Sequence, residues 1–435
     1  MLALGILRRV ETTAAFADKL LEARLRRSTL SHLDRSLTQE LVLGTIRWRG
    51  RIDWVLRSLL DRPLERLTPW IRNILRLGVY QILFLDRIPP PAAVYESVEL
   101  AKRFGHRGTA GLVNAVLRRV VEGEWTYPDP KTDPVGYLSA FYSHPEWMVE
   151  RWLHRYGLEE TEQLCRANNR RAKISIRVNL LRTSVDAAAE SLEREGVRVR
   201  QNSLLDTFLE VEEGGGRLFR TDAFKRGVFS VQDVSGGMAV RLLNPAPGER
   251  ILDMCSAPGG KTTYLAELMQ NQGQIVALDR SETRLREMEK NLRRLGSAIV
   301  ETKPQDVLLY SDDPFDRVLS DVPCSGTGVL ARRADARWNR TEGDIPKMAR
   351  LQLQLLERAG DLVKPGGVIV YSTCTIEPEE NEMVVEKFLR AHPDFYLERA
   401  AQFLSPAVAG EYLETFPHRH GCDGAFSARI KKQKA

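Results

Sequence analysis

The stretch RILDMCSAPGGKT, residues 250–262, decides the fold of the C-terminal half of the chain. It combines a short apolar strand over 250–254, a turn of small residues, and the start of a helix near Lys261. Downstream, helices are predicted to begin near Glu282 and Asp344, and further apolar strands are predicted over 274–279, 315–321 and 367–373. Strands that alternate with helices predict a parallel, doubly wound α/β sheet.

The N-terminal part has a helical pattern instead. Apolar residues recur three and four positions apart over residues 1–125, and the stripes end at Pro89–Pro91 and at Gly105. The proline-rich stretch 125–134 predicts an extended connector.

Between these two parts, the pattern mixes strands with one helix. A strand is predicted over 174–180, a helix over 185–195, and short strands near 197–200 and 208–212. We therefore predict three domains: an all-α bundle over 1–140, a small α+β module over 141–230, and an α/β domain over 231–435.

The composition excludes several classes of protein. In a chain of 435 residues, a hydrophobic fraction of 43% is enough to build ordinary cores, so a wholly disordered chain is excluded. The five cysteines are far apart and predict neither a disulfide framework nor a metal site. The apolar runs fall far short of the ~18 residues that span a bilayer, and the N-terminus has the reverse order of a signal peptide. We expect a soluble, cytoplasmic protein without a metal.

Basic residues are concentrated in the N-terminal part. The formal net charge is +6, and residues 1–140 contain 22 Lys/Arg against 15 Asp/Glu. The rest of the chain is almost balanced. This distribution agrees with a polyanionic partner without proving one, because many basic proteins bind no polyanion.

The turn after the first α/β strand is suited to a ligand. Its small residues let the backbone approach a bound group, and the helix that follows attracts polar groups to its N-terminus. Gly260-Lys261-Thr262 matches the end of a phosphate-binding P-loop, but Cys255 stands where that motif needs its first glycine, which argues against an ATPase.

Two carboxylates follow the next strands. Asp279 ends the second strand, where a carboxylate accepts hydrogen bonds from ribose hydroxyls, although it could instead cap the next helix. Asp306 follows a weak third strand at 299–302 and could meet an adenine amine. These residues predict an adenosyl cofactor, and their spacing leaves NAD and S-adenosylmethionine open.

Two cysteines at the ends of the fourth and fifth strands point to one chemistry. DVPCSGTG (321–328) and YSTCT (371–375) place Cys324 and Cys374 at the edge where parallel-sheet ligands bind. Methylation of a pyrimidine at C5 needs a thiolate that adds to C6 and makes C5 nucleophilic. Asp321 would hold the cytosine edge. A redox pair of cysteines is the alternative.

At this point the sequence resembles the RNA 5-methylcytosine methyltransferases. The shared motifs are SAPGGKT (256–262), DVPCSGTG (321–328), STCT (372–375), QDVS (232–235) and HRHGCDGAF (418–426). LGTIRWRGRIDWVL (43–56) and NAVLRR (114–119) are similar to the NusB-like domain that precedes the Rossmann-like catalytic domain in the ribosomal small subunit methyltransferase B family (RsmB, Sun or Fmu).

The resemblance implies a role for each matching residue. Cys374 matches the nucleophile, Cys324 the residue that assists product release, and Asp321 the motif aspartate near the methionine moiety and the base. Asp279 matches the ribose carboxylate and Asp306 the adenine contact. The cofactor loop matches Cys255, Ser256, Ala257, Pro258, Gly259, Gly260 and Lys261.

The implied function is methyl transfer from S-adenosylmethionine to C5 of a cytosine in 16S ribosomal RNA, by a monomer, through a covalent adduct at C6. The alternatives are the same chemistry on tRNA or another RNA, and a noncatalytic RNA-binding assembly factor. Ala425 departs from the aromatic residue usual in the family and leaves the packing of the last strand open, and Cys165 and Cys422 match no catalytic motif and are expected to be structural.

The residues that contact RNA are less clear from sequence. Two basic clusters could meet phosphates or form solvated surfaces: Arg170, Arg171, Lys173 and Arg177, and Arg332, Arg333, Arg337 and Arg340. Trp338 and Tyr371 could stack on a flipped base, or could serve in the core or at its rim.

Overall fold

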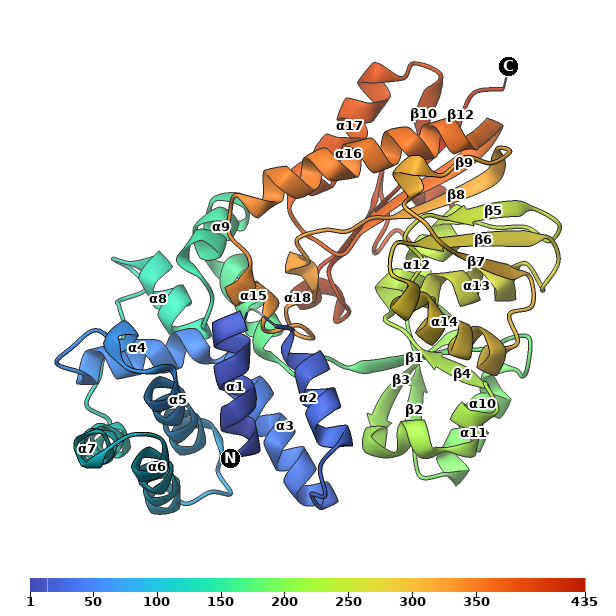
Figure 1. Ribbon diagram of the computed structural model, residues 1–435. Helices are drawn as coiled ribbons and strands as arrows, with labels where there is room; N and C mark the ends of the chain where they lie inside the picture. The colour runs from blue at the N-terminus through green and yellow to red at the C-terminus, as the bar shows by residue number, and fades with distance from the viewer. Residues whose placement is uncertain (14, 435) are drawn as a thin grey trace. The chain divides into compact units, whose positions relative to one another are not determined.

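The structure is a computed structural model that describes residues 1–13 and 15–434 (Figure 1). The chain forms two compact units. The N-terminal unit comprises residues 1–170 and 330–342, and the C-terminal unit comprises 171–329 together with the chain from 343 onward. No helix in the described part of the chain is both long and apolar enough to cross a membrane.

The N-terminal unit is all helical, as the sequence predicts. Its helices pack around one core that includes Leu4, Val42, Ile74 and Leu117, and Gly44 packs directly against the ring of Tyr80. The helices are α1 (Leu2–Thr13), α2 (Ala17–Arg26), α3 (His32–Arg47), α4 (Arg49–Leu59), α5 (Pro69–Phe84), α6 (Pro90–Phe104), α7 (Arg107–Glu122), α8 (Pro134–Tyr142) and α9 (Glu146–Asn169).

Local signals fix where these helices begin and end. Ser31 caps α3 by accepting a hydrogen bond from the Asp34 N–H, and Thr68 caps α5 in the same way. The predicted connector has no helix or strand between α7 and α8. Contacts place α8 and α9 with the bundle, while the predicted domain boundaries at 140 and 230 stay a prediction.

One segment of the N-terminal unit comes from far along the chain. Residues 330–342 include the short helix α15 (Ala336–Asn339). The buried Arg337 guanidinium donates to the Ser143 carbonyl at 2.9 Å and to the Asn168 carbonyl at 3.1 Å. Its predicted contact with phosphate is therefore wrong, because the side chain is fully buried.

The C-terminal unit begins with a small antiparallel sheet. The strand order is β2-β3-β1-β4, and Ile176, Leu192 and Phe229 lie in the core beneath it. The elements are β1 (Ile174–Val178), α10 (Val185–Arg194), β2 (Arg198–Gln201), β3 (Phe208–Glu213), α11 (Asp222–Lys225) and β4 (Phe229–Val231). The strands and the helix predicted for this region are confirmed.

The larger sheet carries the predicted α/β fold. Its order is β10-β12-β9-β8-β5-β6-β7, with β11 paired to β12. Five strands are parallel: β5 (Arg250–Asp253), β6 (Gln274–Asp279), β7 (Val300–Pro304), β8 (Phe315–Asp321) and β9 (Val363–Thr373).

The last three strands correct the expectation of a wholly parallel sheet. β10 (Phe395–Glu398), β11 (Leu413–Thr415) and β12 (Ala425–Lys432) pair antiparallel, and β12 lies against β9 with Phe426 opposite Thr373. The connection from β11 to β12 contains only the short α18 (Pro417–His420), and a parallel crossover needs about a dozen residues or more.

Helices cover both faces of the large sheet. Successive strand residues serve opposite cores: Ile251 packs with α12 (Val234–Leu243) and α13 (Gly260–Leu268), whereas Leu252 packs with α16 (Asp344–Leu362) and α17 (Glu382–Ala391). A further helix, α14 (Glu282–Leu295), follows β6. Burial on both faces explains the apolar runs 251–252, 275–278 and 368–371 in β5, β6 and β9.

Candidate active site

The loop between β5 and α13 is held in a fixed shape. Ser256 donates to the Leu278 carbonyl through its N–H at 2.8 Å and through its hydroxyl at 3.0 Å, which fastens the loop to β6. Gly259 has a φ of +95°, and a Cβ there would lie 2.6 Å from Met288 Cγ. Only glycine fits this position without strain. The Ala257–Pro258 peptide bond is cis.

A buried arginine fastens the helix that follows. Arg177 Nη2 pairs with Glu267 at 2.7 Å and donates to Thr263 Oγ1 at 2.9 Å, and Arg177 Nη1 donates to the Gly260 carbonyl at 2.7 Å. Because this side chain has no solvent exposure, Arg177 neither contacts phosphate nor lies on a solvated surface, the two alternatives that the sequence left open. The residue instead connects β1 to α13 and the loop before it.

Asp279 and Asp306 lie around one pocket with Cys255. Asp279 accepts a hydrogen bond from the Ser281 N–H at 2.8 Å and pairs with Arg284 at 3.1 Å. Asp279 thus orders the turn before the next helix, whose N-cap is Ser281, and it also lines the pocket. Its contact with ribose hydroxyls stays a prediction. The other lining residues are Met254, Arg280, Arg284, Gln305, Val307, Leu308, Pro323, Leu351 and Leu355.

Lys261 and Asp321 form an ion pair at the edge of the sheet. Lys261 Nζ lies 2.7 Å from Asp321 Oδ2, and both side chains are partly exposed. Burial opposes the charge of Lys261, but Asp321 outweighs this effect and raises the lysine pKa. Beneath them, Asp253 accepts a hydrogen bond from Thr262 at 2.6 Å, and burial raises the pKa of Asp253 to about 7.

The two predicted cysteines lie together. Cys324 Sγ is 3.2 Å from Cys374 Sγ, and the Cys374 N–H donates to Cys324 Sγ at 3.4 Å. Both are free cysteines. The hydrogen bond with Cys374 and burial together raise the pKa of Cys324 well above its usual range. Because they lie so close together and share a hydrogen bond, the two thiols can act together on one substrate.

A hydroxyl cluster below the thiols holds both loops in place. Thr375 Oγ1 lies 2.8 Å from Ser325 Oγ and 2.8 Å from Thr327 Oγ1. Glu380 accepts from the Ser325 N–H at 2.9 Å and from Gln352 at 2.8 Å. Glu380 and Gln352 could not be predicted from sequence, since an acid seven residues from the C-terminal end of a strand carries no spacing signal of its own.

Two glycines close the same loops from the other side. The Gly328 N–H donates to the Cys374 carbonyl at 3.1 Å, and the Gly424 N–H donates to the Gly328 carbonyl at 2.8 Å. A Cβ on Gly328 would lie 2.2 Å from the Gly424 carbonyl oxygen. The motif at 418–426 therefore supports the thiol loops, and Ala425 is buried and donates to Thr415 at 3.0 Å without disturbing the strand.

The other residues predicted from sequence differ in how far their side chains are exposed to solvent. Tyr371 is fully buried and donates to the Glu380 carbonyl, so stacking on a base is excluded for it. Cys165 is fully buried in α9, and burial raises its pKa to about 12, as suits a structural thiol. Five basic side chains are exposed and keep RNA contact as a prediction: Arg170, Arg171, Lys173, Arg332 and Arg333. Arg340, partly exposed, keeps it too.

No cluster of three or more metal-ligating side chains occurs in residues 1–13 and 15–434. The site offers thiol chemistry, because two sulfur atoms lie next to each other. A carboxylate paired with an ammonium group and a pocket with carboxylates at its rim accompany them. All three features lie at the carboxyl ends of parallel strands. This is the edge at which such sheets bind ligands.

Comparison with known proteins gives the family. Three family models match successive parts of the chain: the NusB family over residues 1–122, the Methyltr_RsmF/B-like ferredoxin-like domain over 144–215, and 16S rRNA methyltransferase RsmB/F over 240–431. A "Probable ribosomal RNA small subunit methyltransferase B" from Bacillus subtilis is 34% identical over 99% of this chain and 98% of that protein. The chain belongs to the RsmB/F family of rRNA methyltransferases.

Solved structures agree with the RsmB/F assignment. The crystal structure of PH0851 is 31% identical, with a TM-score of 0.83 over 99% of this chain and 97% of that one. The structure of NSun6 from Pyrococcus horikoshii with SFG is 25% identical, with a TM-score of 0.60 over 67% of this chain and 99% of that one. The predicted family and its succession of a NusB-like bundle, a small α+β module and a methyltransferase domain are confirmed.

Proposed function

We propose that this chain transfers a methyl group from S-adenosylmethionine to C5 of a cytosine in small-subunit (16S) ribosomal RNA. The observation that carries the proposal is the pair of thiols 3.2 Å apart, which lies at the same sheet edge as the Lys261–Asp321 ion pair. Membership of a family of rRNA methyltransferases supports the substrate class.

The pocket around Asp279 suits the adenosyl part of that cofactor. Asp279 can accept hydrogen bonds from ribose hydroxyls, and Asp306 can accept one from an adenine amine. Leu308, Pro323 and Leu355 supply apolar walls for a planar base. When bound, S-adenosylmethionine supplies an electrophilic methyl group. The related NSun6 structure contains SFG, an analogue of S-adenosylmethionine, which favours this cofactor over NAD.

The proposed chemistry begins with Cys374. Its thiolate adds to C6 of the cytosine, and the electron pair of the C5–C6 double bond makes C5 a nucleophile that accepts the methyl group. The C5 proton then leaves, its electron pair re-forms the double bond, and the C6–S bond breaks to return the thiolate. Cys324, next to Cys374, assists this release step.

The charged groups nearby favour the first step. Lys261 lies close enough to interact electrostatically with Cys374, and a nearby ammonium group favours a thiolate over a thiol. Asp321, held by Lys261 at 2.7 Å, can accept a hydrogen bond from the cytosine amine and favour protonation at N3. A protonated ring draws electrons from C6 and makes thiolate addition easier.

The test is transfer of labelled methyl from S-adenosylmethionine to unmodified small-subunit rRNA, with tRNA and the Cys374→Ala protein in parallel. We expect 5-methylcytosine in the rRNA alone and none with the variant. Label in tRNA alone would overturn the proposed substrate but keep the chemistry. Absence of label in both RNAs and in an assembled small subunit would favour the noncatalytic assembly factor.

A further inference from the structure

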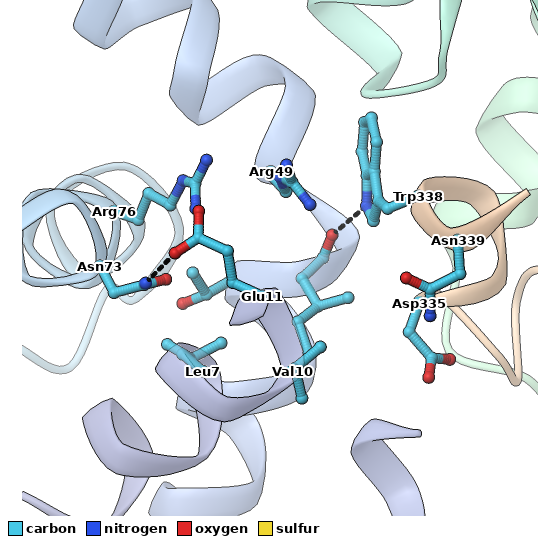
Figure 2. A pocket seen from close by; sticks show the side chains of 11 residues that line it. Leu7, Val10, Glu11, Arg49, Asn73, Arg76, Asp335, Trp338 and Asn339 are labelled. Carbon is cyan, nitrogen blue, oxygen red and sulfur yellow. Dashed lines mark hydrogen bonds and ion pairs between the residues drawn. The ribbon is translucent and has the colours of Figure 1, made fainter. Parts of the chain in front are cut away.

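A second pocket, separate from the one around Asp279, lies wholly within the N-terminal unit (Figure 2). Its volume is about 360 Å³, within the range of small-ligand sites. Residues from α1, α3, α4 and α5 line it together with the segment 330–342. Leu7, Val10 and Ile46 give it an apolar part, and the rest of the lining is polar or aromatic.

The acidic groups of this pocket are held by other parts of the unit. Glu11 pairs with Arg72 and Arg76, each at 2.7 Å, and accepts a further hydrogen bond from Asn73 at 2.7 Å. Burial would raise the pKa of Glu11, but the two arginines outweigh it and hold that pKa below its usual value. Asp335 accepts a hydrogen bond from the Ala17 N–H at 3.0 Å. The Glu11 charge is therefore compensated by cations of the unit itself.

One cation of the lining, by contrast, is poorly neutralised. Arg49 Nε lies 3.6 Å from Asp53, but both oxygens of Asp53 already bind Arg76, at 2.7 and 2.8 Å. The Arg49 guanidinium makes no hydrogen bond to any other part of the described chain. Burial and the like charge of Arg76 lower the pKa of Arg49. An anion would relieve both effects.

The pocket also has a fixed aromatic wall. Trp338 donates its indole N–H to the Ile46 carbonyl at 2.7 Å, which locks the ring, and the Arg49 guanidinium lies 5.4 Å from the ring centroid. Figure 2 shows these two side chains beside each other at the pocket. Of the two aromatic residues that the sequence offered for base stacking, the structure leaves only Trp338 free for that role.

We propose that this pocket binds a single unpaired nucleotide of the RNA substrate, separate from the cytosine that is methylated. The base lies against Trp338 and the apolar floor, and its phosphate pairs with Arg49. This inference rests on the proposed function for the identity of the RNA. Stacking on aromatic side chains together with pairing of phosphate to arginine is the general mode of single-strand RNA recognition.

The test measures affinity of the full-length chain for a fluorescent single-stranded RNA fragment of the small-subunit rRNA, by fluorescence anisotropy. Arg49→Met should weaken binding about tenfold. Arg9→Met is the matched control, because Arg9 is exposed on α1 and loses the same charge; its effect should stay below about twofold, since a single phosphate contact at the surface is weak.

Uridine monophosphate is tested alongside the RNA, to distinguish a free nucleotide from one within a strand.

Equal losses of RNA affinity for Arg49→Met and Arg9→Met would overturn the proposal, because they would show that only the overall positive charge matters. The proposal would also be overturned if Arg49→Met weakened binding of uridine monophosphate but left RNA affinity unchanged. Methyl transfer by the wild-type chain is measured in the same samples. If methylation is intact and Arg49→Met leaves RNA affinity unchanged, only the proposed nucleotide site is refuted. If RNA binding depends on Arg49 but no methyl group is transferred, only the proposed methyl transfer is refuted.

Discussion

At the residue scale, the proposed chemistry assigns attack to Cys374 and release to Cys324. The backbone N–H of Cys374 and the Sγ of Cys324 are already hydrogen-bonded at 3.4 Å, so the pair is ordered before any substrate binds. Removal of the attacking sulfur should therefore stop the reaction without altering the pocket around Asp279.

We predict that Cys374→Ala lowers methyl transfer by at least about a thousandfold, because the covalent route to an activated C5 is lost. Binding of S-adenosylmethionine, measured by calorimetry, should remain within about twofold of the wild-type value, since Cys374 does not line the adenosyl pocket. Methylation near the wild-type rate would contradict the assignment of Cys374 as the nucleophile.

Asp253 gives a prediction about pH. Its pKa is about 7 in the folded chain against 3.8 for an ordinary aspartate, and one of its buried oxygens has no partner in the described chain. Between these two values, the folded state holds a proton that the unfolded state has lost. Rising pH therefore costs the folded state stability, and the cost grows to roughly 4 kcal/mol above pH 7.

Asp253→Asn should remove this cost, because the amide cannot ionise. Urea unfolding at pH 4 and pH 8 should show similar stability for variant and wild type at the lower pH, and a more stable variant at the higher one. A wild-type advantage that increases with pH would show that Asp253 is ionised in the folded chain.

At the element scale, α13 depends on a contact that sequence patterns do not reveal. The strand pattern at 174–178 predicts alternation, with Ile176 and Val178 on one face and Arg177 on the other. In such a pattern, the face that carries the arginine is expected to meet solvent. The structure buries that face, because Arg177 bonds Glu267 and the first turn of α13.

We predict that Arg177→Met destabilises the C-terminal unit by about 3–5 kcal/mol, because it leaves the buried Glu267 carboxylate without its partner. Arg171→Met, an exposed change of the same type, should cost less than about 0.5 kcal/mol. Chemical denaturation measures both. Adding Glu267→Gln to Arg177→Met should restore part of the loss; no recovery would indicate that packing rather than charge is responsible.

Strands and helices of the α/β region could be predicted closely from sequence. β6 and β8 match their predicted bounds, since each ends in an aspartate that follows buried apolar residues, 275–278 in β6 and 318–319 in β8. The antiparallel direction of β12 was not predictable in the same way. Direction depends on the length of the connections and on the partner strand, and the pairing of Phe426 with Thr373 joins residues 53 positions apart.

At the scale of the whole molecule, the chain completes its N-terminal unit with residues that follow the Cys324 loop. The segment 330–342 contributes Arg337, with no solvent exposure, and Trp338, bonded to the Ile46 carbonyl. A run of basic residues in a sequence usually meets solvent. Arg337 is buried because carbonyl groups far away in the sequence accept its hydrogen bonds. A local charge pattern does not reveal such partners.

We predict that a fragment of residues 1–170 is less stable than the same helices in the full chain, because its core lacks this segment. A synthetic peptide of residues 330–342, added in excess, should raise the melting temperature of the fragment by several degrees, as any ligand that binds only the folded state does. A peptide with Arg337→Met should not. Equal melting with and without the peptide would contradict this role.

The central claim, a covalent route through Cys374 with release assisted by Cys324, is tested most directly with the Cys324→Ala protein. It is incubated with S-adenosylmethionine and unmodified small-subunit rRNA, and the products are separated under denaturing conditions and analysed by mass spectrometry after digestion. We predict a protein–RNA adduct in which Cys374 is bonded to a methylated cytosine, absent from Cys324→Ala/Cys374→Ala. No adduct during turnover, or an adduct at another residue, would contradict the account.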